Sequence, residues 1–365
     1  MRSNTLSVQP AVTSGRSNYL TILEDAWQAH LAPRAADAPT VISTFAGAGG
    51  SSLGYSMAGY RELLAVEWDD NAVETFRLNF PDVPVYHGDI AKLSVEQVLD
   101  MTGLQPGQLD VFDGSPPCQG FSTAGKRVMD DPRNGLFREY VRLLRGLQPK
   151  VFVMENVSGM VKGKMKLIFA EILRELKASG YRVSARLMNA MYFNVPQSRE
   201  RMIFIGVRND LGIAPSHPKA ETHARSWGDS LDALCNVAPP PLANNRFTRL
   251  WAQVPIGGAL DDVLGKGRNQ NNMVKPSPAK PFPSVPKSQT NRGAACIVHY
   301  AEPRMVSIPE VMRASSYPDA FRLTGTYYER WARIGNSVPP LFMRAIALHI
   351  RRHILDNLQG DENCA

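Results

Sequence analysis

The fold is decided by residues 40–68, which read TVISTFAGAGGSSLGYSMAGYRELLAVEW. A short β-branched run at 41–45 is followed by a glycine-rich turn, a helical stretch at 50–60 and a second apolar run at 62–68. Strand, turn, helix and strand in this order form a βαβ unit, which joins two parallel strands through a helical crossover. The stretch therefore predicts a parallel sheet with helices packed against it.

The same alternation continues to about residue 212. It predicts further strands at 83–90, 109–115, 150–157 and 201–207, and further helices at 70–80, 137–147 and 167–180. We therefore expect an α/β domain with a Rossmann-like, doubly wound sheet. A long amphipathic helix at 339–358, introduced by a proline pair, is expected to pack back onto this domain.

The composition is that of an ordinary globular chain. Its 365 residues are 44% hydrophobic and 21% charged, which suits about two domains at roughly 150 residues each. No uninterrupted apolar run is long enough to span a membrane, and the N-terminus has no apolar signal-peptide core. The four cysteines include no CxxC pair, which argues against a zinc site or a disulfide framework. We therefore expect a cytoplasmic protein with no membrane partner and no metal.

The regular alternation is lost in the second half of the chain. Residues 218–303 are rich in proline, asparagine and serine, and contain ten Lys or Arg against six Asp or Glu. We interpret them as a second, smaller, loop-rich domain between a first domain at 40–217 and a C-terminal segment at 304–365. Residues 1–39, with a short helical stretch at 21–31, are interpreted as a tail or linker. Charge alone leaves open whether 218–303 is a solvated insertion or a nucleic-acid surface.

Acidic and aromatic residues follow the predicted strands near the glycine turn. Gly47 and Gly49 allow the backbone to approach a ligand at a helix N-terminus. Glu67 ends the second strand, where a carboxylate can accept from both ribose hydroxyls of a nucleoside, and Trp68 can stack on adenine. Asp89 ends the third strand and can accept from an exocyclic amine. Each residue alone is as easily a helix cap or a solvated side chain, but together they predict an adenosine-shaped site at one sheet edge.

A second motif, DGSPPCQGFS at 113–122, presents a cysteine directly after a predicted strand. Two prolines stiffen the backbone before Cys118. A lone cysteine is usually a small buried hydrophobe, but this one leads into a polar, basic loop at 121–135 that is suited to act as a lid. These surroundings favour a thiolate nucleophile.

Two further motifs place charges at strand ends. Glu155 lies in MENV, and Gln197, Arg199 and Arg201 alternate in QSRERMIFIG, so that their side chains are expected on one face. Taken alone, a glutamate and an arginine could simply form a structural ion pair.

In combination, these motifs resemble those of the DNA (cytosine-5) methyltransferases of bacterial type. The matching series, in the family's order, is FAGAGG, EWDDNAVETFRLNFP, GDI, GSPPCQGFS, DPRNGLFREYVR, ENV, QSRERMIFIG and GNSVPP. The resemblance implies a class I methyltransferase domain at 40–217 that binds S-adenosyl-L-methionine, and a target-recognition domain at 218–303. It also implies a monomer that acts on double-stranded DNA, either as a solitary enzyme or beside a cognate restriction endonuclease.

The resemblance also implies roles for individual residues. The residues expected to bind the cofactor, including the two turn glycines, are Phe45, Gly47, Gly49, Glu67, Trp68, Asp89, Ile90, Leu136, Asn336, Ser337 and Val338. Those expected in catalysis are Cys118, Glu155, Arg201, Arg199 and Gln197. Candidates for DNA contact are Gln119, Ser122, Lys126, Arg127, Arg246, Arg249, Arg268, Asn271 and Arg292.

The reaction implied by the resemblance suits these residue types. Carbon 5 of cytosine is a poor nucleophile until the Cys118 thiolate adds to carbon 6 and makes an enamine. A neutral Glu155 carboxyl would donate to ring nitrogen 3, and Arg201 would stabilise charge on oxygen 2. Because the duplex hides the base, it must first be flipped into the pocket. Loss of the carbon 5 proton after methylation then expels the enzyme.

Some positions depart from the family pattern. In SIPEVMRASSYPD, at 307–319, Pro309 and Ala314 replace the expected arginine and leucine. Three alternatives follow from the sequence: a tRNA cytosine-5 methyltransferase, a catalytically silent DNA-binding regulator of the same fold, and a nicotinamide-dependent dehydrogenase. GFS after PPCQ favours DNA over tRNA as the substrate, and the intact catalytic motifs argue against a silent protein. The dehydrogenase is disfavoured because Ser52 stands where a dinucleotide fingerprint requires glycine.

Overall fold

The glycine-turn stretch forms the centre of the molecule. The computed structural model describes residues 18–117, 135–161, 165–232, 234, 238–265, 273–293 and 296–358. β1 (Thr40–Thr44) leads into α2 (Gly50–Met57), which returns to β2 (Arg61–Glu67) as a parallel neighbour of β1. All five residues of β1 are buried, because helices cover both faces of the sheet around it.

The sheet has seven strands in the order β3-β2-β1-β4-β5-β8-β6. The other strands are β3 (Val85–His87), β4 (Val111–Gly114), β5 (Val151–Val157), β6 (Tyr181–Asn189) and β8 (Glu200–Arg208). The predicted Rossmann-like α/β fold is therefore confirmed. Two details differ from the sequence prediction: β6 was not predicted, and β8 runs antiparallel to both β5 and β6.

Two apolar cores sandwich the sheet, because successive strand residues face opposite sides. In β5, Val151 and Val153 belong to the core beneath α2, whereas Phe152 and Met154 belong to the opposite core. The opposite core is covered by α4 (Val95–Thr102), α5 (Gly135–Leu147) and α6 (Met165–Ala178). The first core also contains α3 (Asp70–Asn79) and the C-terminal helix α10 (Pro340–Ile350), which continues as a π-helix, Arg351–Leu355.

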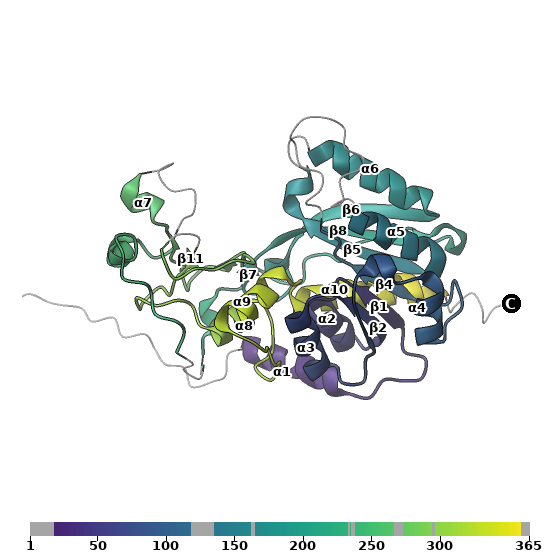
Figure 1. Cartoon of the computed structure of the whole chain (residues 1–365), viewed down its shortest axis with the longest axis horizontal. Helices are drawn as coiled ribbons and strands as arrows, with labels where there is room; N and C mark the ends of the chain where they lie inside the picture. The colour runs from purple at the N-terminus through teal and green to yellow at the C-terminus, as the bar shows by residue number, and fades with distance from the viewer. Residues whose placement is uncertain are drawn as a thin grey trace, which may run out of the picture.

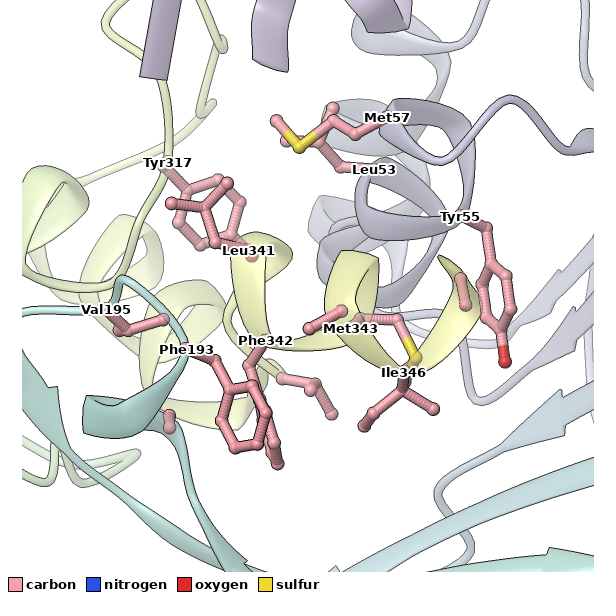
Figure 2. Close-up of a cluster of buried hydrophobic side chains, with 14 of the residues drawn as sticks. Leu53, Tyr55, Met57, Phe193, Val195, Tyr317, Leu341, Phe342, Met343 and Ile346 are labelled. Carbon is pink, nitrogen blue, oxygen red and sulfur yellow. The ribbon is translucent and has the colours of Figure 1, made fainter. Parts of the chain in front are cut away.

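The C-terminal helix returns to the sheet domain, as the sequence predicts. Figure 2 shows Leu53 and Met57 of α2 close to Leu341 and Met343 of α10. The two helices touch at Gly54, where an added Cβ would lie 2.6 Å from Met343 Cβ. Only a glycine lets the helices pack this closely.

Residues 18–39, which the sequence assigns to a tail or linker, are packed against the sheet domain. α1 (Asn18–Leu31) contains the predicted helical stretch and buries Tyr19, Leu23 and Ala26. The Tyr19 hydroxyl donates to the backbone oxygen of Arg313 at 2.5 Å. The apolar face of α1 therefore places residues 18–31 in the core of the sheet domain, a packing that the interpretation as a tail or linker does not anticipate.

A smaller lobe lies to one side of the sheet domain (Figure 1). It contains α7 (Asp261–Leu264), a pairing of β9 (Met273–Val274) with β11 (Cys296–Ile297), and its own small core around Val254, Leu260 and Met273. β10 (Phe282–Pro283) pairs with β7 (Gln197–Ser198) and so joins this lobe to the sheet domain.

Two helices lie between the lobe and the sheet, α8 (Ile308–Ala314) and α9 (Tyr327–Asn336). The two departures from the family pattern fit α8: Pro309 lies in its first turn, where a missing N–H costs nothing, and Ala314 is fully buried. Short 3-10 turns span Ile90–Lys92, Ser158–Val161, Ala190–Tyr192, Asn209–Leu211, Gly228–Ser230 and Thr248–Gln253. No helix in the described part of the chain is long and apolar enough to cross a membrane.

Candidate active site

A cavity of about 680 Å³ opens at the carboxyl ends of the central parallel strands. Its wall comes from the turns after β1, β2, β4 and β5, and on the far side from 284–287 and from α9 and the residues that follow it. This is the edge at which open α/β sheets bind ligands, and the volume lies in the usual range of roughly 300–1,000 Å³ for ligand pockets.

The turn after β1 is held by the carboxylate that ends β2. Glu67 Oε2 accepts from the backbone N–H of Gly47 at 2.8 Å, and Oε1 accepts from the N–H groups of Trp68 and Asp69 at 2.8 and 3.0 Å. Phe45 adopts a φ of 55°, a left-handed conformation that is strained for a side chain of this size. Glu67 thus fixes two turns of the cavity wall while its carboxylate faces the cavity.

The structure brings most of the predicted cofactor residues to this wall. Those that line the cavity are Phe45, Gly47, Glu67, Trp68, Asn336, Ser337 and Val338. The residues match what a nucleoside would need: Trp68 is 77% exposed, and the space beyond Gly47 is open, with no atom within 4 Å of an added Cβ. A methyl donor that carries an adenosine group therefore fits the side chains present.

Four predicted cofactor residues do not line the cavity. An added Cβ at Gly49 would lie 2.5 Å from the Phe80 ring, so this glycine allows helix packing. The Asp89 side chain is exposed and accepts from the Ala91 N–H at 3.0 Å. Ile90 and Leu136 contribute to the core beneath α5. Their contact with a cofactor stays a prediction.

Glu155 and Arg201 meet in the cavity as an ion pair. Arg201 Nε lies 2.5 Å from Glu155 Oε1, and the two side chains are only 14% and 12% exposed. The pair depends on the direction of β8: because this strand is antiparallel, its first residues lie beside the last residues of β5, and Arg201 pairs in register with Val157. If β8 were parallel to β5, Arg201 would lie at the amino ends of the strands, away from the cavity.

Gln197 and Arg199 support the walls of the site. Arg199 is 2% exposed and donates to the backbone oxygens of Val285 at 3.0 Å and Gly335 at 2.7 Å. Burial, assisted by the Arg201 cation, lowers the pKa of the Arg199 guanidinium to about 9. Gln197 does not line the cavity, because its amide instead donates to Ser315 Oγ at 2.7 Å.

Several predicted residues lie outside the described part of the chain: Cys118, Gln119, Ser122, Lys126, Arg127, Arg268 and Asn271. The cavity reaches the residues immediately before the cysteine, Ser115 to Pro117. Asn156, which is 4% exposed, donates from Nδ2 to the Pro116 oxygen at 3.1 Å and so anchors this turn to β5. Sequence reasoning missed this role, although the ENV motif contains the residue.

The remaining DNA-contact candidates lie together on the small lobe. Arg246, Arg249 and Arg292 are all exposed. Asn245 Nδ2 donates to the backbone oxygen of Arg292 at 2.9 Å, which brings the segment at 246–249 beside residue 292.

Three charged residues of the cavity wall were not predicted: Asp69, Lys287 and Arg333. Asp69 could have been predicted from the sequence, since it lies in the EWDD motif and directly follows two predicted cofactor residues. Lys287 and Arg333 come from distant segments with no local motif, so only the folded chain reveals them.

Comparison with known proteins agrees with this geometry. The chain matches the model of the C-5 cytosine-specific DNA methylase family over residues 39–247 and 260–352. It is 34% identical over 328 residues to the Type II methyltransferase M1.HphI of Haemophilus parahaemolyticus, covering 84% of this chain and 85% of that protein. It is 44% identical over 195 residues to M.AquIA, a Type II methyltransferase of Picosynechococcus sp., covering 51% of this chain and 77% of that protein.

Solved structures of lower identity share the fold. A protein encoded within an E. coli prophage superimposes with a TM-score of 0.68 at 24% identity, covering 87% of this chain and all of that one. The DNMT2 of Spodoptera frugiperda superimposes with a TM-score of 0.63 at 19% identity, covering 84% of this chain and 98% of that one. By its family match, its relatives and its fold, the chain belongs to the C-5 cytosine-specific DNA methylases and is a DNA cytosine-5 methyltransferase.

Proposed function

We propose that the enzyme flips a cytosine out of duplex DNA, adds the Cys118 thiolate to carbon 6, and methylates carbon 5 with S-adenosyl-L-methionine as the donor. The observation that carries the proposal is the ion pair of Glu155 and Arg201, which faces the same cavity as the Glu67 turn. One end of the cavity thus offers groups for a pyrimidine and the other end groups for a nucleoside.

The donor would be held by residues of the glycine turn and of the segment after α9. Glu67 would accept from the ribose hydroxyls, and Trp68 would lie against the adenine ring. Asn336, Ser337 and Val338 would close the far wall. When bound, S-adenosyl-L-methionine supplies an electrophilic methyl group.

The target base would be activated by this chain's own side chains. The Cys118 thiolate forms a bond to carbon 6, and the ring electrons move to carbon 5. For this step Glu155 would first take up a proton as the incoming base separates it from Arg201. It would then donate that proton to nitrogen 3, while Arg201 would donate to oxygen 2 and stabilise the charge there. Asn156 would fix the turn that precedes the cysteine. Once carbon 5 carries the methyl group, water would take up the carbon 5 proton. The 5,6 double bond would then re-form, the thiolate would leave, and nitrogen 3 would return its proton to Glu155.

Duplex DNA is the proposed substrate, with the arginines of the small lobe contacting it. Exposed Arg246, Arg249 and Arg292 suit phosphate and groove contacts. Relatives named Type II methyltransferases favour a place in a restriction-modification system, with a separate endonuclease, over a solitary enzyme. We further propose that the enzyme works as a monomer in the bacterial cytoplasm.

Methyl transfer measured beside cofactor binding tests this function. With a tritiated donor and duplex DNA, we expect Cys118→Ala to lose incorporation while its calorimetric affinity for S-adenosyl-L-methionine stays near that of the wild type. The matched control is Cys296→Ala, which changes a buried cysteine in the core of the small lobe and should keep activity. Wild-type incorporation by Cys118→Ala, or incorporation into tRNA and not into DNA, would contradict the proposal.

A further inference from the structure

We infer that Asp69 and Arg333 are positioning residues, which assemble the nucleoside end of the cofactor site by joining two segments that are remote in sequence. The inference rests on the proposed function, since it takes the cavity to be the site of S-adenosyl-L-methionine. Neither residue was predicted from the sequence, and both line the cavity.

The contact is a two-pronged ion pair. Arg333 Nη1 donates to Asp69 Oδ1 at 2.7 Å, and Nη2 donates to Oδ2 at 3.1 Å. A planar guanidinium that meets a carboxylate in this way fixes orientation as well as distance. The Arg333 side chain is 10% exposed and that of Asp69 38%, so the pair is partly shielded from water. The pair therefore fixes α9 against the turn after β2 in one orientation.

Asp69 is placed to transmit this contact to the cofactor wall. It directly follows Glu67 and Trp68, and its Oδ1 also accepts from the Ala72 N–H at 2.9 Å, which caps α3. Partial burial opposes ionisation, but this N–H, Arg333 and the nearby Lys287 cation together lower the pKa of Asp69. The carboxylate therefore stays charged at neutral pH and binds both α3 and α9.

Arg333 lies one turn before the other wall of the site. It stands three residues ahead of Asn336 in α9, the helix that leads into the predicted cofactor residues 336–338. On its other side α9 is fixed to the small lobe, where Trp331 Nε1 donates to the Pro286 oxygen at 3.0 Å. At Gly335 an added Cβ would lie 2.3 Å from the same oxygen. The pair with Asp69 adds to these contacts an ionic contact between α9 and the turn after β2.

The fold does not depend on this pair alone. Just before α9, Thr324 Oγ1 accepts from Asn71 Nδ2 at 3.0 Å and lies 2.9 Å from Thr75 Oγ1. In the same segment, the Arg322 oxygen accepts from Asn79 Nδ2 at 2.8 Å. These bonds hold the segment against α3 when the pair is broken. We therefore expect the loss to fall on the geometry of the cavity, and hence on cofactor affinity.

Three variants separate this role from a general effect on stability. Asp69→Asn keeps the cap of α3, because asparagine caps a helix about as well as aspartate, but loses the charge. Arg333→Gln removes the guanidinium, and Arg333→Lys keeps the charge without the two-pronged geometry. The matched control is Arg145→Gln, which breaks the exposed pair of Arg145 and Glu175, 2.6 Å apart between α5 and α6.

The experiment is calorimetric titration of each folded variant with S-adenosyl-L-methionine, beside kcat and the KM for DNA at saturating donor. We expect Asp69→Asn and Arg333→Gln each to raise the donor Kd roughly tenfold, about 1.4 kcal/mol, with kcat and the KM for DNA near wild type. Arg333→Lys should recover part of the affinity, and the double variant should bind no more weakly than either single variant. Arg145→Gln should bind as the wild type does.

The outcomes distinguish this inference from the proposed function. If the wild type and Glu67→Ala bind the donor alike, the site assignment itself fails. If Glu67→Ala weakens binding but Asp69→Asn and Arg333→Gln do not, the inference is overturned and the proposed function stands. A lowered melting temperature with an unchanged donor Kd would likewise show a role in stability alone and overturn it.

Discussion

Under the proposed function, two charged residues at the carboxyl ends of the strands hold and activate the target pyrimidine. Glu155 lies near the end of β5 and Arg201 near the start of β8, and the contact between Oε1 and Nε brings a carboxylate and a cation to one point of the cavity. Removing one member of a nearly buried pair leaves the other without its partner and deletes a group that stabilises the reacting base. The consequence should therefore be kinetic.

Replacing Arg201 by alanine should lower kcat by about 10²–10³, the usual cost of losing one donor that stabilises developing charge. Donor affinity should change little, because Glu67 and Trp68 at the nucleoside end remain in place. Steady-state kinetics with labelled donor, beside calorimetry, measure both. Arg182→Ala, an exposed arginine of β6, serves as the control. An unchanged kcat in Arg201→Ala would remove this residue from catalysis.

A carboxyl that does not line the cavity, Glu62 at the start of β2, should appear in the pH dependence of folding. Burial raises the pKa of Glu62 to about 7, against hydrogen bonds from Ser43 and Ser52 that lower it, and burial also raises the pKa of Asp113. Between pH 4.5 and 7 the unfolded chain ionises this glutamate while the folded chain keeps it protonated. The folded state then binds more protons, so its stability falls as the pH rises through this window.

Glu62→Gln should abolish that loss, because a glutamine cannot ionise. Relative to the wild type, the variant should gain about 3 kcal/mol of unfolding free energy between pH 4.5 and 7, from ~1.4 kcal/mol per pKa unit. Urea unfolding at a series of pH values measures the difference. Parallel stability curves across this range would show that Glu62 ionises normally in the fold.

Single site residues could be predicted from the sequence where a polar side chain stands at the end of a predicted strand. Glu67 and Glu155 were found in this way, because an apolar run followed by a carboxylate is a local pattern. Arg333 was not found, since it meets Asp69 across 264 residues and lies just before the GNSVPP motif at 335–340, outside the matched residues. At Gly49 the structure adds a reason that the motif does not reveal, because a side chain there would collide with the Phe80 ring.

At the scale of elements, the strands with continuous apolar sequence and the parallel direction of most of them were predictable, but the strand order and the reversal of β8 were not. β1, β4 and β5 are fully buried or nearly so, and their runs stand out. β6 is an edge strand in which apolar and polar residues alternate from Tyr181 to Leu187. It therefore lacks the continuous apolar run by which the other strands were predicted, although the alternation was itself a usable strand signal. The reversal of β8 is a property of the assembled sheet, yet it creates the contact between Glu155 and Arg201.

The close packing of α2 on α10 provides a test at this scale. Gly54→Ala would place a Cβ 2.6 Å from Met343 Cβ and 2.7 Å from the Pro340 oxygen, so the helices must separate. We expect destabilisation of about 1–3 kcal/mol, as for other overpacked cores. Gly135→Ala, where an added Cβ meets nothing within 4 Å, is the matched control. Equal unfolding midpoints for the two variants would mean that the helices tolerate the extra atom.

For the whole molecule, charge and the two-lobed shape together favour a polyanionic substrate. The chain carries a net charge of +7, and three exposed arginines lie together on the small lobe. DNA affinity should fall linearly with log salt, because each neutralised phosphate releases counterions. Replacing Arg246, Arg249 or Arg292 by alanine should lower the salt slope by about 1 for each phosphate that the variant no longer neutralises. Arg145→Ala is the control. If the variants of the small lobe keep the salt slope of the wild type, the DNA does not contact these arginines.

The cysteine step is tested most directly by trapping. A duplex would carry 5-fluorocytosine at the cytosine that bisulfite sequencing identifies as modified in cells expressing the enzyme. Fluorine cannot leave carbon 5 as a proton does, so the account predicts a denaturation-stable adduct that forms only with S-adenosyl-L-methionine present and maps to Cys118. An enzyme that methylates the ordinary duplex but forms no adduct with the fluorinated one, or forms it at another residue, would contradict the account.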